Sequence, residues 1–172
     1  MAGILNIAVW LGAAVFFNFS VGPAFHSEAV SELLGPKSYP YFSPAMEQIL
    51  AARLFHLQIA CGAMALLHVL AEWLYSGRSP QKRWLALLVA VLAIALMAGG
   101  WLEPKLAVLH NVRYGGNAGI GQRENAARAF SAWQQADRLA NMLLIAGVAV
   151  YLWRVANPPD PTRFVSAAKF RS

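Results

Sequence analysis

Four apolar runs, each long enough to cross a lipid bilayer, constrain the fold more than any other feature of this sequence. A helical span needs about 20 predominantly apolar residues. The runs occupy residues 4–25, 52–75, 84–102 (or 84–110) and 130–153. Helices are expected because an open sheet leaves backbone groups unsatisfied in lipid. We therefore predict an all-α integral membrane protein, a four-transmembrane-helix bundle forming a single membrane domain over residues 1–172.

The composition agrees with this class. Hydrophobic residues make up 58% of the chain and charged residues only 13%, whereas soluble domains are about 25% charged. The basic residues behind the +6 net charge are spread among loops and the tail. That distribution suits anionic lipid headgroups and predicts the lipid bilayer, with no nucleic acid, as the partner. The single cysteine, Cys61, excludes an intrachain disulfide and a cysteine zinc site.

The connections between the runs set the expected orientation. Residues 26–51 and 103–129 form two long loops, and the prolines of 26–51 predict an irregular segment or a short helix. The short turn 76–83 and the tail 154–172 are rich in Arg and Lys, which favour the cytoplasmic side. We expect both termini to be cytoplasmic and both long loops to lie outside. The expected location is a bacterial inner membrane.

Ionisable side chains lie within two of the apolar runs, where they are costly and usually face the protein interior. His68 and Glu72 are four residues apart, so one helix face brings them together. Asp137 and Arg138 begin the fourth run. These four residues are candidates for a proton or cation relay. The alternative is a hydrogen-bonded pair that only satisfies its own polar groups.

Small and amide residues fall at a similar depth in all four runs. Small residues let helix backbones approach closely, and amides can bond across the gap. We predict a polar interhelical layer formed by Asn18, Gln58 or Cys61, and Asn141, closed by the pair Gly99 and Gly100. Such a layer either holds the helices together or forms a substrate or ion site.

Histidines give the candidates for cofactor and metal binding. His56 and His68 are twelve residues apart, about 18 Å along a helix, so they cannot share a metal. Either is a candidate axial ligand for b-type haem or chlorophyll. His26, His56 and His110 fall near outer helix ends, and imidazoles from three helices can bind copper, zinc or haem iron. The expected cofactor, if there is one, is therefore haem b, chlorophyll or copper.

The first and last runs carry a family resemblance. Trp10, Leu11 and Gly12, then Phe16 and Phe17, then an exit through Pro23 and Phe25 make the first run similar to that of four-span proteins related to transmembrane protein 205. That family is one of unknown function. Phe130, Leu139 and Asn141 resemble its last span, although Gln134 and Asp137 stand where the family often has His and Ser. The layout is also similar to membrane subunits of copper-resistance systems.

The sequence predicts a role without catalysis, because it has no Ser–His–Asp pattern and its glycine-rich segment follows no strand. The first expectation is an accessory or structural subunit of a membrane complex, or a protein that handles a small solute or metal. Other membrane subunits would then dock through the outer loops. A haem or chlorophyll carrier and a proton- or cation-coupled transporter are the alternatives.

Overall fold

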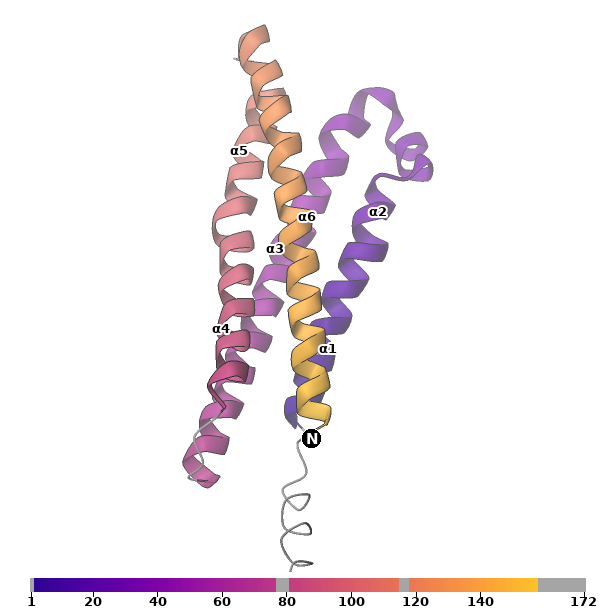
Figure 1. Ribbon diagram of the computed structural model, residues 1–172. Coiled ribbons are helices and arrows are strands. Elements are labelled where there is room, and N and C mark those ends of the chain that lie inside the picture. Colours follow the sequence, from indigo (N-terminus) through magenta and orange to yellow (C-terminus); the bar gives the residue numbers. More distant parts are fainter. Residues whose placement is uncertain (1, 77–80, 115–117, 158–172) are drawn as a thin grey trace, which may run out of the picture.

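The computed structural model describes residues 2–76, 81–114 and 118–157, and within these ranges it contains helices and no strand (Figure 1). Four continuous helical stretches are long and apolar enough to span a membrane: Ala2–Phe25, Glu28–Tyr75, Lys82–Tyr114 and Ile120–Ala156. The prediction of an all-α membrane bundle is confirmed. The expected count of one domain stays a prediction.

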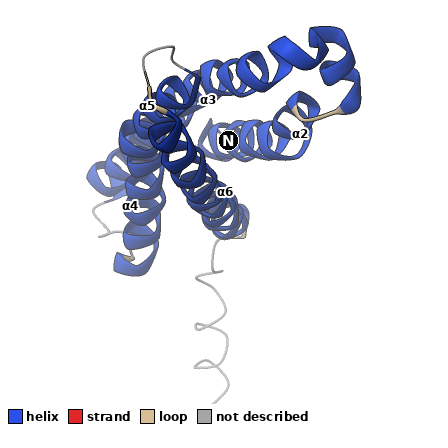
Figure 2. Ribbon diagram, turned by 90° about the horizontal axis from the view of Figure 1, so that it is seen from above, coloured by secondary structure: helices blue, strands red, loops and turns tan. Residues whose placement is uncertain are grey.

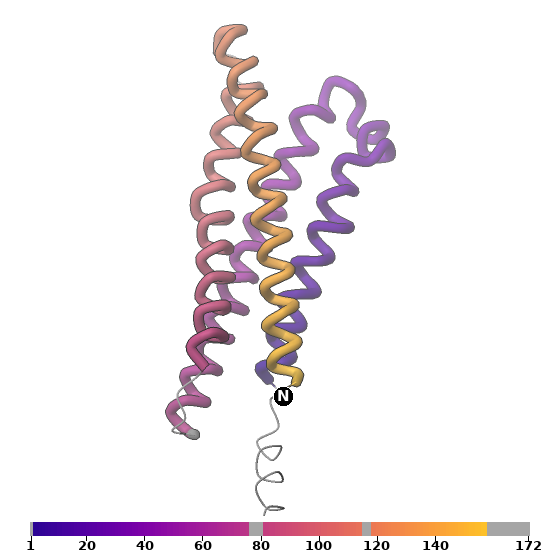
Figure 3. The backbone as a smooth tube through the Cα atoms, in the orientation of Figure 1, coloured from indigo at the N-terminus to yellow at the C-terminus, as the bar shows by residue number. Residues whose placement is uncertain are grey.

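The elements follow one another as two long helical hairpins. The first hairpin contains α1 (Ala2–Phe16), η1 (Phe17–Val21), α2 (Gly22–Phe25) and α3 (Glu28–Ser76). The second contains α4 (Lys82–Met97), η2 (Ala98–Leu102), α5 (Glu103–Tyr114) and α6 (Ile120–Ala156). Helix α1 packs on α3 and α6, while α6 also packs on α4 and α5. The start of α1 and the end of α6 lie at the same end of the bundle (Figure 3).

The segment expected as an irregular first loop is helical, so that prediction is wrong. Helix α3 already begins at Glu28 and runs to Ser76, with one break at Gly35, where φ is +72°. This left-handed conformation favours glycine. Pro36 then restarts the helix, because a proline in the first turn loses no hydrogen bond. Seen from above, this part of α3 extends to one side of α4, α5 and α6 (Figure 2).

The second long loop is also mostly helical, which agrees with the longer alternative 84–110 for the third run and corrects the expectation of a loop over the rest of 103–129. Helix α5 continues the third span to Tyr114, and α6 starts at Ile120, well before the apolar run at 130. Its 37 residues make α6 about 55 Å long, longer than the roughly 30 Å hydrocarbon core. Residues 77–80 of the basic turn and residues 158–172 of the tail lie outside the described residues.

Each hairpin contains one π-helical turn in its first arm. In η1 the N–H of Gly22 donates to the carbonyl of Phe17, and in η2 the N–H of Glu103 donates to the carbonyl of Ala98. Both bonds span five residues instead of four. Such turns widen a helix and occur frequently at functional sites.

Prolines account for both π-turns. Pro23 directly follows the donor Gly22, and Pro104 directly follows the donor Glu103. A proline inside a helix has no N–H and its ring clashes with the carbonyl four residues earlier. The extra residue of a π-turn moves that carbonyl away, so the helix axis continues through the proline.

The apolar core fills the half of the bundle near the termini. Its largest side chain is Trp10 of α1, which is 1% exposed, and its other members come from α1, α3, α4 and α6: Ile7, Ala14, Cys61, Ala65, Leu88, Val91, Ala95, Leu144, Val148 and Tyr151. Many large apolar side chains, including Leu67, Leu96 and Leu143, are exposed on the outer helix faces. That surface suits lipid, so the bilayer is the partner the helices support.

Candidate functional site

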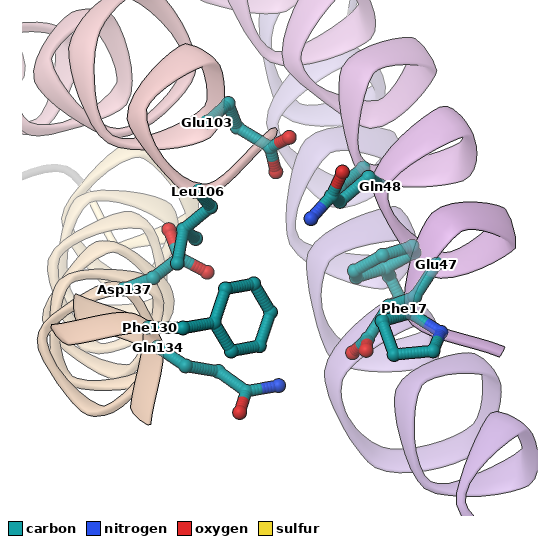
Figure 4. Close-up of a pocket in the computed structure, with 10 residues that line it drawn as sticks. Phe17, Glu47, Gln48, Glu103, Leu106, Phe130, Gln134 and Asp137 are labelled. Atoms are coloured by element: carbon teal, nitrogen blue, oxygen red, sulfur yellow. The ribbon is translucent and has the colours of Figure 1, made fainter. Parts of the chain in front are cut away.

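An acidic cavity begins where the apolar core ends. It receives the carboxylates of Glu47 from α3, Glu103 from α5 and Asp137 from α6. In Figure 4 Glu103 and Asp137 approach the space from one side and Glu47 from the other. Three acidic groups from three helices therefore share one space between the two hairpins.

The remaining lining of the acidic cavity is both polar and aromatic. The amides of Gln48 and Gln134 reach into it, and Phe17, Leu106 and Phe130 supply apolar surface (Figure 4). Phe17 is the first residue of the π-turn η1. The cavity thus offers negative charge and aromatic faces to the same ligand.

Two of the carboxylates have hydrogen-bond partners. His26 Nε2 lies 3.1 Å from Glu47 Oε2, which joins the end of α2 to α3. Asn141 Nδ2 donates to Asp137 Oδ2 over 3.1 Å within α6. Glu103 lines the cavity with two other carboxylates, those of Asp137 and Glu47, and forms no ion pair with a basic side chain within the described residues. Glu103 is therefore the carboxylate whose charge these neighbours leave uncompensated.

An inner pocket adjoins the acidic cavity and shares Phe17, Ala51, Glu103 and Asp137 with it. Gln58 lines this pocket and is only 4% exposed. Its Nε2 is buried and has no hydrogen-bond partner among the described residues. A buried donor without an acceptor is destabilising by about 1–3 kcal/mol. The Gln58 amide is therefore available to donate a hydrogen bond to a molecule in the inner pocket.

The π-turn of the second hairpin forms the opposite wall of the inner pocket. Ala98 and Gly99 of η2 line it, and Glu103 follows η2 directly. A Cβ at Gly99 would overlap the ring of Phe55 in α3. This close approach holds η2 against α3 beside Gln58.

The sequence of this chain matches a known family over most of its length. A family described as a domain of unknown function, DUF4149, matches residues 5–115, from α1 through α5. The chain belongs to the DUF4149 family. The match includes Glu47, Gln58 and Glu103 but ends before Asp137. No curated protein and no solved structure matches the chain.

The DUF4149 match supports an uncharacterised membrane protein and goes no further. It connects the chain neither to transmembrane protein 205 nor to copper-resistance subunits, so both remain resemblances. The family description attaches no reaction, cofactor or transported solute to any residue. The chemistry of this DUF4149 protein has to be argued from its own side chains.

The structure does not bring together the three histidines considered for a metal. His26 contacts Glu47, whereas His56 Nδ1 lies 2.6 Å from the carbonyl oxygen of Ala52. His110 is buried against the rings of Tyr41, Tyr114 and Phe130. Among the described residues, no group of three or more His, Cys, Asp or Glu side chains is arranged to hold a metal ion.

The candidate haem or chlorophyll ligands lie outside the two cavities. His56 and His68 are exposed, and neither lines the acidic cavity or the inner pocket. The His68 ring sits where a Cβ on Gly3 would come within 2.7 Å of it. His68 therefore packs against the start of α1.

Residues of the expected polar layer have different surroundings. Gln58, Gly99 and Asn141 line the inner pocket. Asn18 instead donates to the carbonyl of Ala14 in its own helical stretch, over 2.9 Å. Cys61 belongs to the apolar core.

Gly100 corrects the expectation that both glycines close the layer. It is exposed, and a Cβ there would meet no atom within 4 Å. Gly99 and Gly100 cannot both face α3, because consecutive residues of a helix point about 100° apart.

The relay candidates fall in two separate parts of the bundle. Asp137 lines the acidic cavity, and Arg138 beside it is exposed. His68 packs near Gly3, which is fourteen residues from Phe17 at the cavity, or about 21 Å along a helix. The structure therefore associates Asp137 with Glu103 instead of with His68 and Glu72.

Glu47 and Glu103 were not among the site residues predicted from the sequence. Both fall in segments expected to be outer loops, where acidic residues are ordinary. A usable signal was the step from an apolar run to Glu103–Pro104, since a proline that a helix continues through requires a local distortion.

Proposed function

We propose that this protein handles a small cationic solute, binding it in the acidic cavity and exchanging it for protons across the membrane. The observation that carries the proposal is the meeting of Glu47, Glu103 and Asp137 in one space. Buried charges are strongly unfavourable unless they are paired. Carboxylates sharing a site relieve their repulsion either by binding a proton or by binding a cation. The two occupants therefore compete for the same groups.

The neighbours of the three carboxylates indicate that the cavity exchanges a single positive charge. His26 faces Glu47, and Arg138 interacts with Asp137, which Asn141 also contacts. Glu103 forms no ion pair with a basic side chain in the part of the chain that the structure describes. We therefore assign Glu103 as the main exchange group and a monovalent cation as its ligand.

The position of the cavity suits access from one side. One helical turn deeper than the inner pocket, Cys61, Ala95 and Leu144 belong to the packed core. In the span layout expected from the sequence, Glu103 directly follows the apolar run 84–102, at the edge of the hydrocarbon layer. A ligand could pass from the inner pocket through the packed core only if the two hairpins moved against each other there.

Proton movement in reconstituted vesicles tests this function. Proteoliposomes loaded with the pH dye pyranine would receive an outside pulse of sodium, potassium, tetramethylammonium or choline chloride. At least one cation should raise the internal pH with the original chain and with Glu32→Gln, an exposed acid outside the cavity. Glu103→Gln should abolish the response, because the exchangeable charge is gone. Responses that match those of empty vesicles for all four cations would overturn the proposal.

A further inference from the structure

Resting on the proposed function, we infer that the ligand is a small organic monocation of the quaternary ammonium class that carries a hydroxyl group. The cavity gives three independent reasons. They concern the aromatic lining, the arrangement of the carboxylates and the unused amide of Gln58.

The first reason is the lining around the carboxylates. Phe17 and Phe130 present rings to the same space as Glu103 and Asp137, and Leu106 adds aliphatic surface (Figure 4). A cation within about 6 Å of an aromatic face is attracted by the ring, and quaternary ammonium groups are recognised in this way. A hydrated metal ion gains little from apolar walls, whereas the methyl groups of an alkylammonium ion fit them.

The second reason is that the acids surround a space instead of converging on a point. Within the described residues they do not form a group able to hold a metal ion. Separated carboxylates beside apolar surface suit a cation whose charge is spread over several heavy atoms better than a bare metal ion, which needs its ligands close together.

The third reason comes from Gln58 and is independent of the acidic groups. Gln58 is only 4% exposed and lines the inner pocket, and its Nε2 has no hydrogen-bond partner in the part of the chain that the structure describes. This N–H needs an acceptor, which an ammonium head cannot supply. A hydroxyl oxygen can accept from Gln58 while its proton is donated to Glu103 or Asp137, which line the same pocket.

The ligand would therefore lie along the two connected spaces. Its methylated head would occupy the acidic cavity between Phe17 and Phe130, and its hydroxyl would reach the inner pocket at Gln58. Electrical balance requires one monocation to displace about one proton from the carboxyl groups.

Calorimetric titration of the full chain in mild detergent tests the ligand class with choline, tetramethylammonium and sodium as probes. Choline should bind about tenfold more tightly than tetramethylammonium, as expected for one added hydrogen bond. Gln58→Leu should lower the affinity for choline to that for tetramethylammonium, because the hydroxyl then loses its hydrogen-bond donor. Glu103→Gln should weaken both organic cations by about 30-fold, since it removes a buried charge partner, whereas Glu32→Gln should not.

The outcomes separate this inference from the proposed function. Sodium- or potassium-driven proton movement that depends on Glu103, without choline binding, overturns the organic ligand and leaves cation handling in place. Equal affinities for choline and tetramethylammonium in the original chain overturn the hydroxyl contact, whatever the folding of the variants. Absence of any Glu103-dependent response to all the cations overturns both.

Discussion

Neighbouring glycines in η2 allow the packing of the two hairpins to be tested with one added methyl group. Gly99→Ala places a Cβ against the Phe55 ring at its Cγ and Cδ2 atoms, whereas Gly100→Ala meets no atom within 4 Å. Because Cγ is the ring atom nearest the backbone, rotating the ring does not remove the overlap. Either the ring moves as a whole or α3 and η2 separate.

The expected magnitude follows from overpacking, which is destabilising by about 1–3 kcal/mol. The gain in helix propensity from Gly to Ala is up to about 1 kcal/mol, and the two adjacent positions share it. Gly99→Ala should therefore be less stable than Gly100→Ala by about 1–3 kcal/mol, or roughly 5- to 150-fold in the folded-to-unfolded ratio.

Equilibrium unfolding in mixed micelles, followed by circular dichroism as the fraction of SDS rises, would measure this difference. Phe55→Ala combined with Gly99→Ala should recover part of the loss, because the double variant removes the overlapping ring. Equal stability of the two single alanine variants would refute the contact between η2 and α3.

Three further substitutions have expected effects on the same unfolding measurement. Gln58→Leu should raise stability without ligand by up to about 1–3 kcal/mol, because it removes a buried donor that has no acceptor among the described residues; a large loss would mean that this amide is satisfied in the folded protein. Asn141→Leu should lower stability by about 0.5–1.5 kcal/mol, since its bonds go to Asp137 within α6; loss of helix association itself would point to a bond across the bundle. His26→Ala should change stability by no more than about 1 kcal/mol, because the ion pair with Glu47 is partly exposed, and a larger loss would show that this pair anchors α2 on α3.

Much of the fold follows from the sequence because hydrophobic length is a strong physical signal. A run such as 130–153 has to be helical in lipid, whatever its neighbours do. The extensions of the helices beyond the runs gave no such signal. Residues 28–51 contain Gly35 and three prolines, which read locally as a loop. Tertiary packing of α3 on α2, including the 2.6 Å bond from Ser43 to the carbonyl of Phe25, accompanies the helix there.

The candidate site was less accessible to sequence reasoning. Helical spacing identifies which residues of one helix share a face, and it put Asp137 and Asn141 together. It does not say which face of α3 or α5 meets that face of α6. Glu47 and Glu103 join Asp137 only through the packing of different helices, so their meeting depends on interhelical geometry that no local pattern contains.

The two π-turns connect the fold to the proposed chemistry. The hairpins repeat one plan, in which a helix, a π-turn closed just before a proline and a second helical piece lead into a long returning helix. Phe17 of η1 and Gly99 of η2 both line the inner pocket, so the irregular turn of each hairpin faces the space between them. Transporters built from repeats bind their substrates at the repeat interface, beside interrupted helices. Pro23 and Pro104, which interrupt α-helical hydrogen bonding, thus accompany a widened turn in both helices beside Glu103. A cation would enter the bundle at this position, and the two hairpins would move against each other here.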